Sequence, residues 1–231
     1  MLMSPQNLPE RINAVLGQVR QAVATAGRSA QSVTVLAIGK AQAPQTLADA
    51  ARCGLTQFGE SYLQEALGKQ AALRELPLTW HFVGRVQANK TRVIAEQFAW
   101  VHAVDRLKIA ERLAAQRPFH APPLNVCLQV NLAAEATKGG VAPGELPVLA
   151  TAVAQLPRVK LRGLMCIPPE EAEPAGQRAW FARLRVLRDE LNAGGLSLDT
   201  LSMGMSADFQ AAIMEGSTIV RLGTALFGAR P

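Results

Sequence analysis

A lysine that ends a run of apolar residues is the first candidate for chemistry in this chain. Lys40 directly follows the apolar segment 33–39, which has the length and composition of a buried strand. Because burial disfavours the charged form of an amine, a lysine at the mouth of such a strand can be neutral and nucleophilic near neutral pH. A neutral amine is what a Schiff base with an aldehyde requires. The alternative is a lysine that ends a strand and extends its amine into water.

Two segments near the C-terminus predict a binding site for an anion. The segment 201–206 reads as a strand that ends in a glycine, after which Ser206 is expected to cap a short helix. The N-terminus of a helix presents N–H groups to an anion. In the segment 219–228 a strand runs into Gly223 and Thr224, which offer close backbone approach and a hydroxyl. Each feature alone has an ordinary structural explanation, as a helix cap or a turn. Together with the lysine they predict a pocket for a phosphorylated aldehyde.

A third candidate is Arg221, a charged residue inside the apolar strand segment 219–222. A buried charge is costly unless it is paired. Pyridoxal 5′-phosphate (PLP) has a ring nitrogen that an inward arginine can face as a donor. An arginine there leaves the ring nitrogen unprotonated and weakens the cofactor as an electron sink. The alternative is a buried ion pair between this arginine and a carboxylate such as Glu60.

The elements that must position these residues alternate regularly along the chain. Of its 231 residues 49% are hydrophobic, which is typical of a globular protein. Segments of strand length alternate with segments of helical periodicity throughout, which predicts one α/β domain over residues 1–231. We expect a (β/α)8 TIM barrel with an extra N-terminal helix at about 7–26, and a doubly wound open sheet is the alternative. The predicted strands are 33–39, 56–59, 79–84, 100–104, 124–131, 161–167, 200–203 and 219–222.

The amino-acid composition of the chain limits the kinds of ligand and partner that we expect it to bind. The net charge of +6 suits anionic ligands, but the few aromatic residues (5%) do not alternate with basic ones as in a nucleic-acid-binding surface. No apolar run is long enough for a membrane span, and the N-terminus lacks the features of a signal peptide. A cytoplasmic protein that binds neither nucleic acid nor membranes is therefore expected. Three cysteines without a C-x-x-C pattern, at positions 53, 127 and 166, predict reduced residues and no metal site.

Several stretches of the chain match the motifs of one known family, in the same order and over nearly the whole length of the chain. The chain resembles the pyridoxal phosphate homeostasis protein family, small single-domain PLP-binding proteins related to the barrel domain of alanine racemase. The stretches are 35–40, 57–60, 80–84 with Gln87, Asn89 and Lys90, then 162–165, 202–206 and 219–230.

The resemblance implies a role for each of the candidate residues. It implies that Lys40 carries PLP as a Schiff base, an internal aldimine. It also implies that Ser206, Gly223 and Thr224 hold the phosphate and that Arg221 faces the pyridine nitrogen.

Three further residues are expected to bind the cofactor. Ser61 stands where the family usually has asparagine and can still donate a hydrogen bond, although it also fits a capping box with Gln64. His81 lies near the end of the third predicted strand, where it either contacts the cofactor or is an ordinary core histidine. Met165 lies in the matching stretch 162–165.

Other departures and motifs bear on the prediction. Gly39 precedes the lysine where the family commonly has serine, and Ala41 follows it where a second lysine is frequent. The segment 84–91 nearly matches a P-loop, but Asn89 takes the place of its second glycine and would crowd the phosphates.

The predicted function is PLP binding in intracellular PLP (vitamin B6) homeostasis, without efficient catalysis. The alternative is a PLP-dependent amino-acid racemase, which needs a second base on the opposite face of the cofactor. Tyr62 is the only tyrosine, and a second domain after the barrel is not expected. Apo PLP-dependent enzymes are the possible partners of such a carrier, and a monomer is expected.

Overall fold

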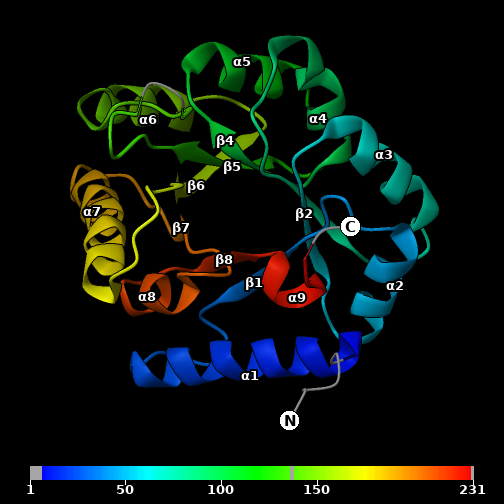
Figure 1. Ribbon diagram of the computed structural model, residues 1–231. Coiled ribbons are helices and arrows are strands. Elements are labelled where there is room, and N and C mark those ends of the chain that lie inside the picture. The colour runs from blue at the N-terminus through cyan, green and yellow to red at the C-terminus, as the bar shows by residue number, and fades with distance from the viewer. Residues whose placement is uncertain (1–6, 136–137, 230–231) are drawn as a thin grey trace.

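Eight parallel strands close into a barrel in the computed structural model, which describes residues 7–135 and 138–229 (Figure 1). Neighbouring strands follow the order of the sequence, and β8 pairs with β1. The prediction of a TIM barrel is therefore confirmed, and the open-sheet alternative is wrong. The strands are β1 (Thr34–Ile38), β2 (Gln57–Glu60), β3 (Thr79–Phe82), β4 (Trp100–Val104), β5 (Leu124–Gln129), β6 (Val159–Met165), β7 (Thr200–Ser202) and β8 (Ile219–Leu222).

Helices follow the strands and form the outer layer of the barrel (Figure 1). The α-helices described after β1 are α2 (Pro44–Arg52), α3 (Leu63–Ala72), α4 (Thr91–Gln97), α5 (Leu107–Gln116), α6 (Leu146–Ala154), α7 (Pro174–Ala193), α8 (Phe209–Met214) and α9 (Thr224–Phe227). Short 3-10 turns, η1 (Ala88–Lys90) and η2 (Pro143–Glu145), precede α4 and α6.

The additional N-terminal helix is present as predicted. This helix, α1 (Leu8–Thr25), begins at Asn7, whose side chain forms a reciprocal capping box with Glu10. Its buried face packs with α2, α8 and α9 and covers the side of the barrel where β8 meets β1. The helix thus shields the strand pair on which the candidate site depends.

Pairing between the last and the first strand fixes where the candidate residues lie. In this parallel ladder Thr34 pairs with Ile219 and Leu36 pairs with Arg221. The carboxyl ends of β1 and β8 therefore lie side by side at one rim. Ligands bind at this rim in TIM barrels, because the loops that follow the strands meet there.

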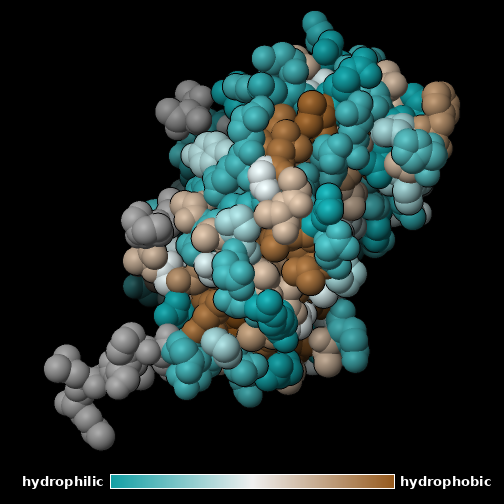
Figure 2. All heavy atoms as spheres, turned by 90° about the vertical axis from the view of Figure 1, so that its right-hand side faces the viewer, coloured by the Kyte–Doolittle hydropathy of each residue, from teal (hydrophilic) through white to brown (hydrophobic). Residues whose placement is uncertain are grey.

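Hydrophilic residues dominate the side of the molecule that carries α2 and α3, with narrow strips of hydrophobic residues between them (Figure 2). None of the helices in the described ranges has both the length and the apolar character needed to cross a membrane. The cysteines at 53, 127 and 166 are free thiols, and burial raises the pKa of Cys127 and of Cys166 to about 12. Those two thiols are therefore protonated and unreactive at neutral pH.

Gly163 in β6 is predicted to be a stability-critical position of the barrel. A Cβ at this position would lie 1.7 Å from the carbonyl oxygen of Thr200 in β7. Because backbone atoms cannot yield, Gly163→Ala should lower the free energy of unfolding by roughly 3 kcal/mol or more. Gly68→Ala is the control, since nothing lies within 4 Å of its added methyl group in α3 and it should stabilise by about 0.5–1 kcal/mol. Urea unfolding of both variants checks this, and equal effects would contradict it.

Candidate functional site

A cavity of about 470 Å³ opens at the carboxyl rim of the barrel. Residues that follow β1, β2, β3, β6, β7 and β8 line it, together with Ile38 of β1 and Arg221 of β8. The structure thus brings together candidates that lie far apart in the sequence. Six of the eight predicted residues line the cavity: Lys40, Ser61, Ser206, Arg221, Gly223 and Thr224.

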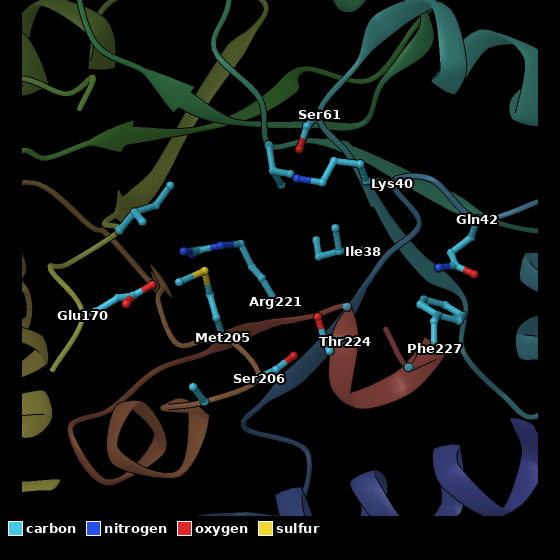
Figure 3. A pocket seen from close by; sticks show the side chains of 15 residues that line it. Ile38, Lys40, Gln42, Ser61, Glu170, Met205, Ser206, Arg221, Thr224 and Phe227 are labelled. Atoms are coloured by element: carbon cyan, nitrogen blue, oxygen red, sulfur yellow. The ribbon is translucent and has the colours of Figure 1, made fainter. Parts of the chain in front are cut away.

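The side chains approach the cavity from different sides (Figure 3). Lys40 and Ser61 lie next to each other on one side, and Ser206 and Thr224 lie on the other. Arg221 extends between them. An amine and a group of hydroxyls therefore face one space from opposite sides, as a ligand with an aldehyde at one end and a phosphate at the other would require.

The backbone on both sides of Lys40 is held by two charged residues of α3. The amine of Lys69 donates to the carbonyl oxygen of Gly39 at 2.6 Å. The carboxylate of Glu65 accepts the N–H of Ala41 at 2.7 Å and also pairs with Lys69 at 2.5 Å. The turn that carries Lys40 is therefore anchored to α3 through both neighbouring peptide groups.

Close packing beneath this turn explains the glycine before the lysine. A Cβ at Gly39 would lie 2.5 Å from Oε1 of Glu60. Ala41 takes a left-handed conformation with φ of +62°, which is unfavourable for alanine and needs support from its surroundings. The bond from Ala41 to Glu65 supplies that support.

Glu60 is a buried carboxylate below the turn. Its Oε1 pairs with Lys69 at 2.8 Å, whereas its Oε2 is buried without a hydrogen-bond partner. Burial raises the pKa of the Glu60 carboxyl, against the opposing effect of Lys69. The predicted alternative of an ion pair between Glu60 and Arg221 is wrong, because Lys69 is the partner of this carboxylate.

Arg221 is held by oxygen atoms that carry no charge. Its guanidinium donates to the carbonyl oxygen of Ser202 at 2.6 Å, to the Ser202 hydroxyl at 3.0 Å and to the carbonyl oxygen of Cys166 at 2.8 Å. Burial lowers the pKa of Arg221. A guanidinium has five N–H donors, so these three bonds fix its plane and leave donors for a ligand.

The phosphate side of the cavity differs in detail from the prediction. Ser206 does not cap a helix, because the chain forms a turn after Ser206 and α8 begins only at Phe209. Its hydroxyl accepts the N–H of Ala225 at 3.1 Å and so ties the loop after β7 to the start of α9. Thr224 is the first residue of α9, directly after Gly223. The two loops thus form one cradle.

The predicted capping box of Ser61 is also absent. Tyr62 occupies the cap position of α3, and no side chain caps this helix. Ser61 instead packs against Gly84, where a Cβ would lie 2.2 Å from the Ser61 carbonyl oxygen. The Ser61 side chain therefore lines the cavity and does not serve the helix.

His81 and Met165 do not line the cavity. Met165 is buried with Ala103 and Cys127 inside the barrel. Nε2 of His81 bonds Oε1 of Gln57 at 2.8 Å, and its Nδ1 bonds Nε2 of His102 at 2.9 Å. Both side chains are buried in the core of the barrel, and their direct contact with the cofactor stays a prediction.

A chain of hydrogen bonds connects His81 to the cavity. Nδ1 of His102 lies 2.8 Å from the Ser202 hydroxyl, which in turn accepts a bond from Arg221. Since β4 and β7 are not neighbours, the bond between His102 and Ser202 crosses the barrel interior. Oε1 of Gln57 accepts the Nε2–H of His81, so Nδ1 of neutral His81 accepts the Nε2–H of His102, and the Ser202 hydroxyl donates to Nδ1 of His102.

Sequence reasoning missed Ser202 as the partner of Arg221 and His102 as the partner of Ser202, and also Lys69 and Glu65 on α3. Polar residues within apolar strands were the available signal for the first pair. Gln42, Met205 and Glu170 also line the cavity, and their place in the loops after predicted strands could have indicated them. Across the described ranges, no group of three or more metal-ligating side chains was found that could hold a metal ion.

We predict that removing Lys69 destabilises the fold. Lys69→Met leaves the buried Glu60 carboxylate without its partner, so the free energy of unfolding should fall by about 3–5 kcal/mol. The double variant Glu60→Gln/Lys69→Met should regain part of this loss, because a neutral amide costs less to bury than a carboxylate. Urea unfolding measures both, with the exposed Lys108→Met as control. A loss for Lys69→Met no larger than that of the control would show that the pair is unimportant.

The buried histidines predict a pH dependence of stability. Burial lowers the pKa of His81 to about 3 and lowers that of His102 well below its ordinary value. Below pH 6.5 the unfolded chain binds protons that the folded histidines do not, so stability falls as the pH falls. Each histidine contributes up to about 1.4 kcal/mol per pH unit below 6.5.

The variant His102→Gln isolates one of these contributions. Between pH 6 and pH 5 its free energy of unfolding should fall less steeply than that of the unchanged protein, by about 1 kcal/mol per unit. Identical slopes in urea unfolding series would mean that His102 is protonated in the folded state.

Comparison with known proteins agrees with this geometry. The family model described as the N-terminal domain of alanine racemase matches residues 14–231. The pyridoxal phosphate homeostasis protein of Pseudomonas aeruginosa is 59% identical over 223 residues, 96% of each chain. That of Escherichia coli K12 is 47% identical over 93% of this chain and 95% of its own. The structure of PipY from Synechococcus elongatus with PLP bound is 36% identical, with a TM-score of 0.85, and covers 96% of this chain and 100% of that chain. This chain therefore belongs to the pyridoxal phosphate homeostasis protein family.

Proposed function

We propose that the protein binds PLP in the rim cavity and acts in PLP homeostasis as a carrier. One observation carries the proposal: the Lys40 amine, the Arg221 guanidinium and the cradle of Ser206 and Thr224 line a single cavity. The names of the relatives and the PLP in PipY support the same assignment.

The residues present fit this cofactor. PLP supplies an aldehyde that condenses with an amine, a phosphate dianion and an aromatic ring with a basic nitrogen. Lys40 holds the cofactor covalently through its aldehyde carbon. Ser206, Gly223 and Thr224 hold its phosphate through hydroxyl and backbone donors. The donors of Arg221 that are free of Ser202 and Cys166 face the ring nitrogen.

The residues around the cavity favour holding the cofactor over catalysis. An arginine at the ring nitrogen leaves that atom unprotonated, so the ring withdraws electrons less strongly. Racemisation also needs a base on each face of the cofactor, and Tyr62 is the one tyrosine available. Tyr62 is 61% exposed, and its ring centroid lies 5.9 Å from the amine of Lys40, on the lysine side of the site. Tyr62 is therefore not the opposing base.

A carrier of this kind acts on other proteins. Apo PLP-dependent enzymes are the recipients that we propose, and they share the compartment of the carrier, the cytoplasm. One chain supplies all the site residues that line the cavity, so we propose a monomer as the functional unit.

The central test is covalent loading of Lys40. The protein incubated with PLP should absorb in the visible range, and borohydride should fix the cofactor to the peptide that contains Lys40, as mass spectrometry detects. Lys40→Ala should lose both signals, whereas Lys108→Ala, which removes an exposed lysine of α5, should keep them. A colourless product, or a label on another lysine, would contradict the proposal.

The racemase alternative has its own outcome. A racemase exchanges the α-hydrogen of a free amino acid for deuterium far faster than PLP alone does. The carrier proposal expects exchange no faster than with free PLP at the same concentration. Rapid exchange that Lys40→Ala abolishes would favour the racemase.

A further inference from the structure

A second cavity of about 470 Å³ adjoins the first at the same rim. It lies between the loop after β2 and the loop after β3, and Ser61 lines both cavities. Tyr62 forms part of its wall, and the Lys40 amine lies 5.9 Å from the centroid of that ring. A ligand in this second cavity would therefore lie directly beside the lysine of the first.

The lining of this cavity includes both apolar and positively charged side chains. Leu63, Phe82 and Ile94 contribute buried apolar side chains, and Arg85 and Lys90 contribute the charges. No aspartate or glutamate lines the cavity. A concave site lined by apolar side chains and by cations favours a small molecule with an apolar body and an anionic group.

The two cations are free of internal partners. Neither the Arg85 nor the Lys90 side chain has an ion pair or hydrogen bond within the described ranges of the chain. Nearby basic residues differ in this respect: Arg92 pairs with Glu96 at 3.9 Å, and Arg106 pairs with Asp105 at 2.8 Å. The charges that line the cavity are thus the ones left available for a ligand.

The turn that carries Lys90 is held from behind. Nε of Arg112 in α5 donates to the carbonyl oxygen of Ala88 at 3.0 Å and to the hydroxyl of Thr91 at 3.2 Å. The Thr91 hydroxyl donates to the same carbonyl oxygen at 2.9 Å and is fully buried. This hydroxyl cannot coordinate a nucleotide-bound magnesium ion, so the segment 84–91 is no P-loop. It is instead a fixed turn that presents Lys90 at the cavity.

We propose that this second cavity binds a small organic anion, with its carboxylate or phosphate between Arg85 and Lys90 and its apolar body on Phe82 and Ile94. Charge-assisted hydrogen bonds to the two cations supply affinity and orientation. The cavity has room for a compound the size of an amino acid or a phosphorylated ring. The inference does not depend on the proposed function, because it concerns residues outside the first cavity's cradle.

Titration with small aromatic probes tests the proposal and identifies the anionic group. Phenylacetate and phenyl phosphate are added separately to the ¹⁵N-labelled protein, with benzyl alcohol as the neutral probe. We expect saturable binding of at least one anion, with amide shifts at Tyr62 and Gln87 and much weaker binding of the alcohol. Preference between the two anions tells whether the site takes carboxylates or phosphates.

Two double variants show whether binding depends on the cations of this cavity or only on the net charge of the protein. Arg85→Gln/Lys90→Gln should weaken binding about tenfold or more, because both charge-assisted contacts are lost. The control Arg92→Gln/Lys108→Gln removes the same charge outside the cavity and should leave binding within about twofold. Absence of saturable binding, or equal weakening in both double variants, would overturn the proposal.

The adjoining cavity needs a separate control, since phenyl phosphate could enter the cradle at Thr224. The titration is therefore repeated on protein whose Lys40 carries PLP fixed by borohydride. Binding that persists supports the second site, and binding that disappears assigns the probe to the first cavity and overturns the inference. If Lys40 takes up no PLP, the phenylacetate titration of the untreated protein still tests the second cavity, while the proposed function alone fails.

Discussion

The pairing of the first strand with the last is the constraint on which the candidate site depends. Lys40 and Thr224 are separated by most of the chain, yet the ladder between β1 and β8 places their loops next to each other. In an open sheet of the same strands these two loops would lie at opposite edges. Closure of the barrel therefore brings together the amine and the proposed phosphate cradle, and α1 covers the seam from outside.

Buried polar groups hold the residues of this site through hydrogen bonds. Beneath Lys40, the Lys69 ammonium and the Glu65 carboxylate hold the two peptide groups beside this lysine. Ser202 and Cys166 hold Arg221 without giving it a negative partner, and His102 bonds the Ser202 hydroxyl. An uncharged set of acceptors keeps the guanidinium in place and leaves its positive charge toward the cavity, as the proposed contact with an unprotonated ring nitrogen requires.

Most of the fold followed from the sequence, because periodicity reports which faces are buried. All eight predicted strands and the N-terminal helix are present, with boundaries that differ by a few residues, as at β3 and β6. Six candidate residues reached one cavity because loops after parallel strands share a rim. The predictions that were wrong concern the hydrogen-bond and ion-pair partners of individual side chains. Ser206 bonds Ala225 and not its own helix, and Glu60 pairs with Lys69 and not with Arg221. Such pairs are set by contacts between elements, which local sequence does not encode.

The measurement that tests the account most directly is a crystal structure of the protein soaked with PLP. The account predicts continuous density from Nζ of Lys40 to the aldehyde carbon of the cofactor. It also predicts the phosphate against Ser206 and Thr224, and the guanidinium of Arg221 within hydrogen-bond distance of the ring nitrogen. Density for PLP elsewhere on the molecule, or a phosphate turned away from the loops after β7 and β8, would contradict it.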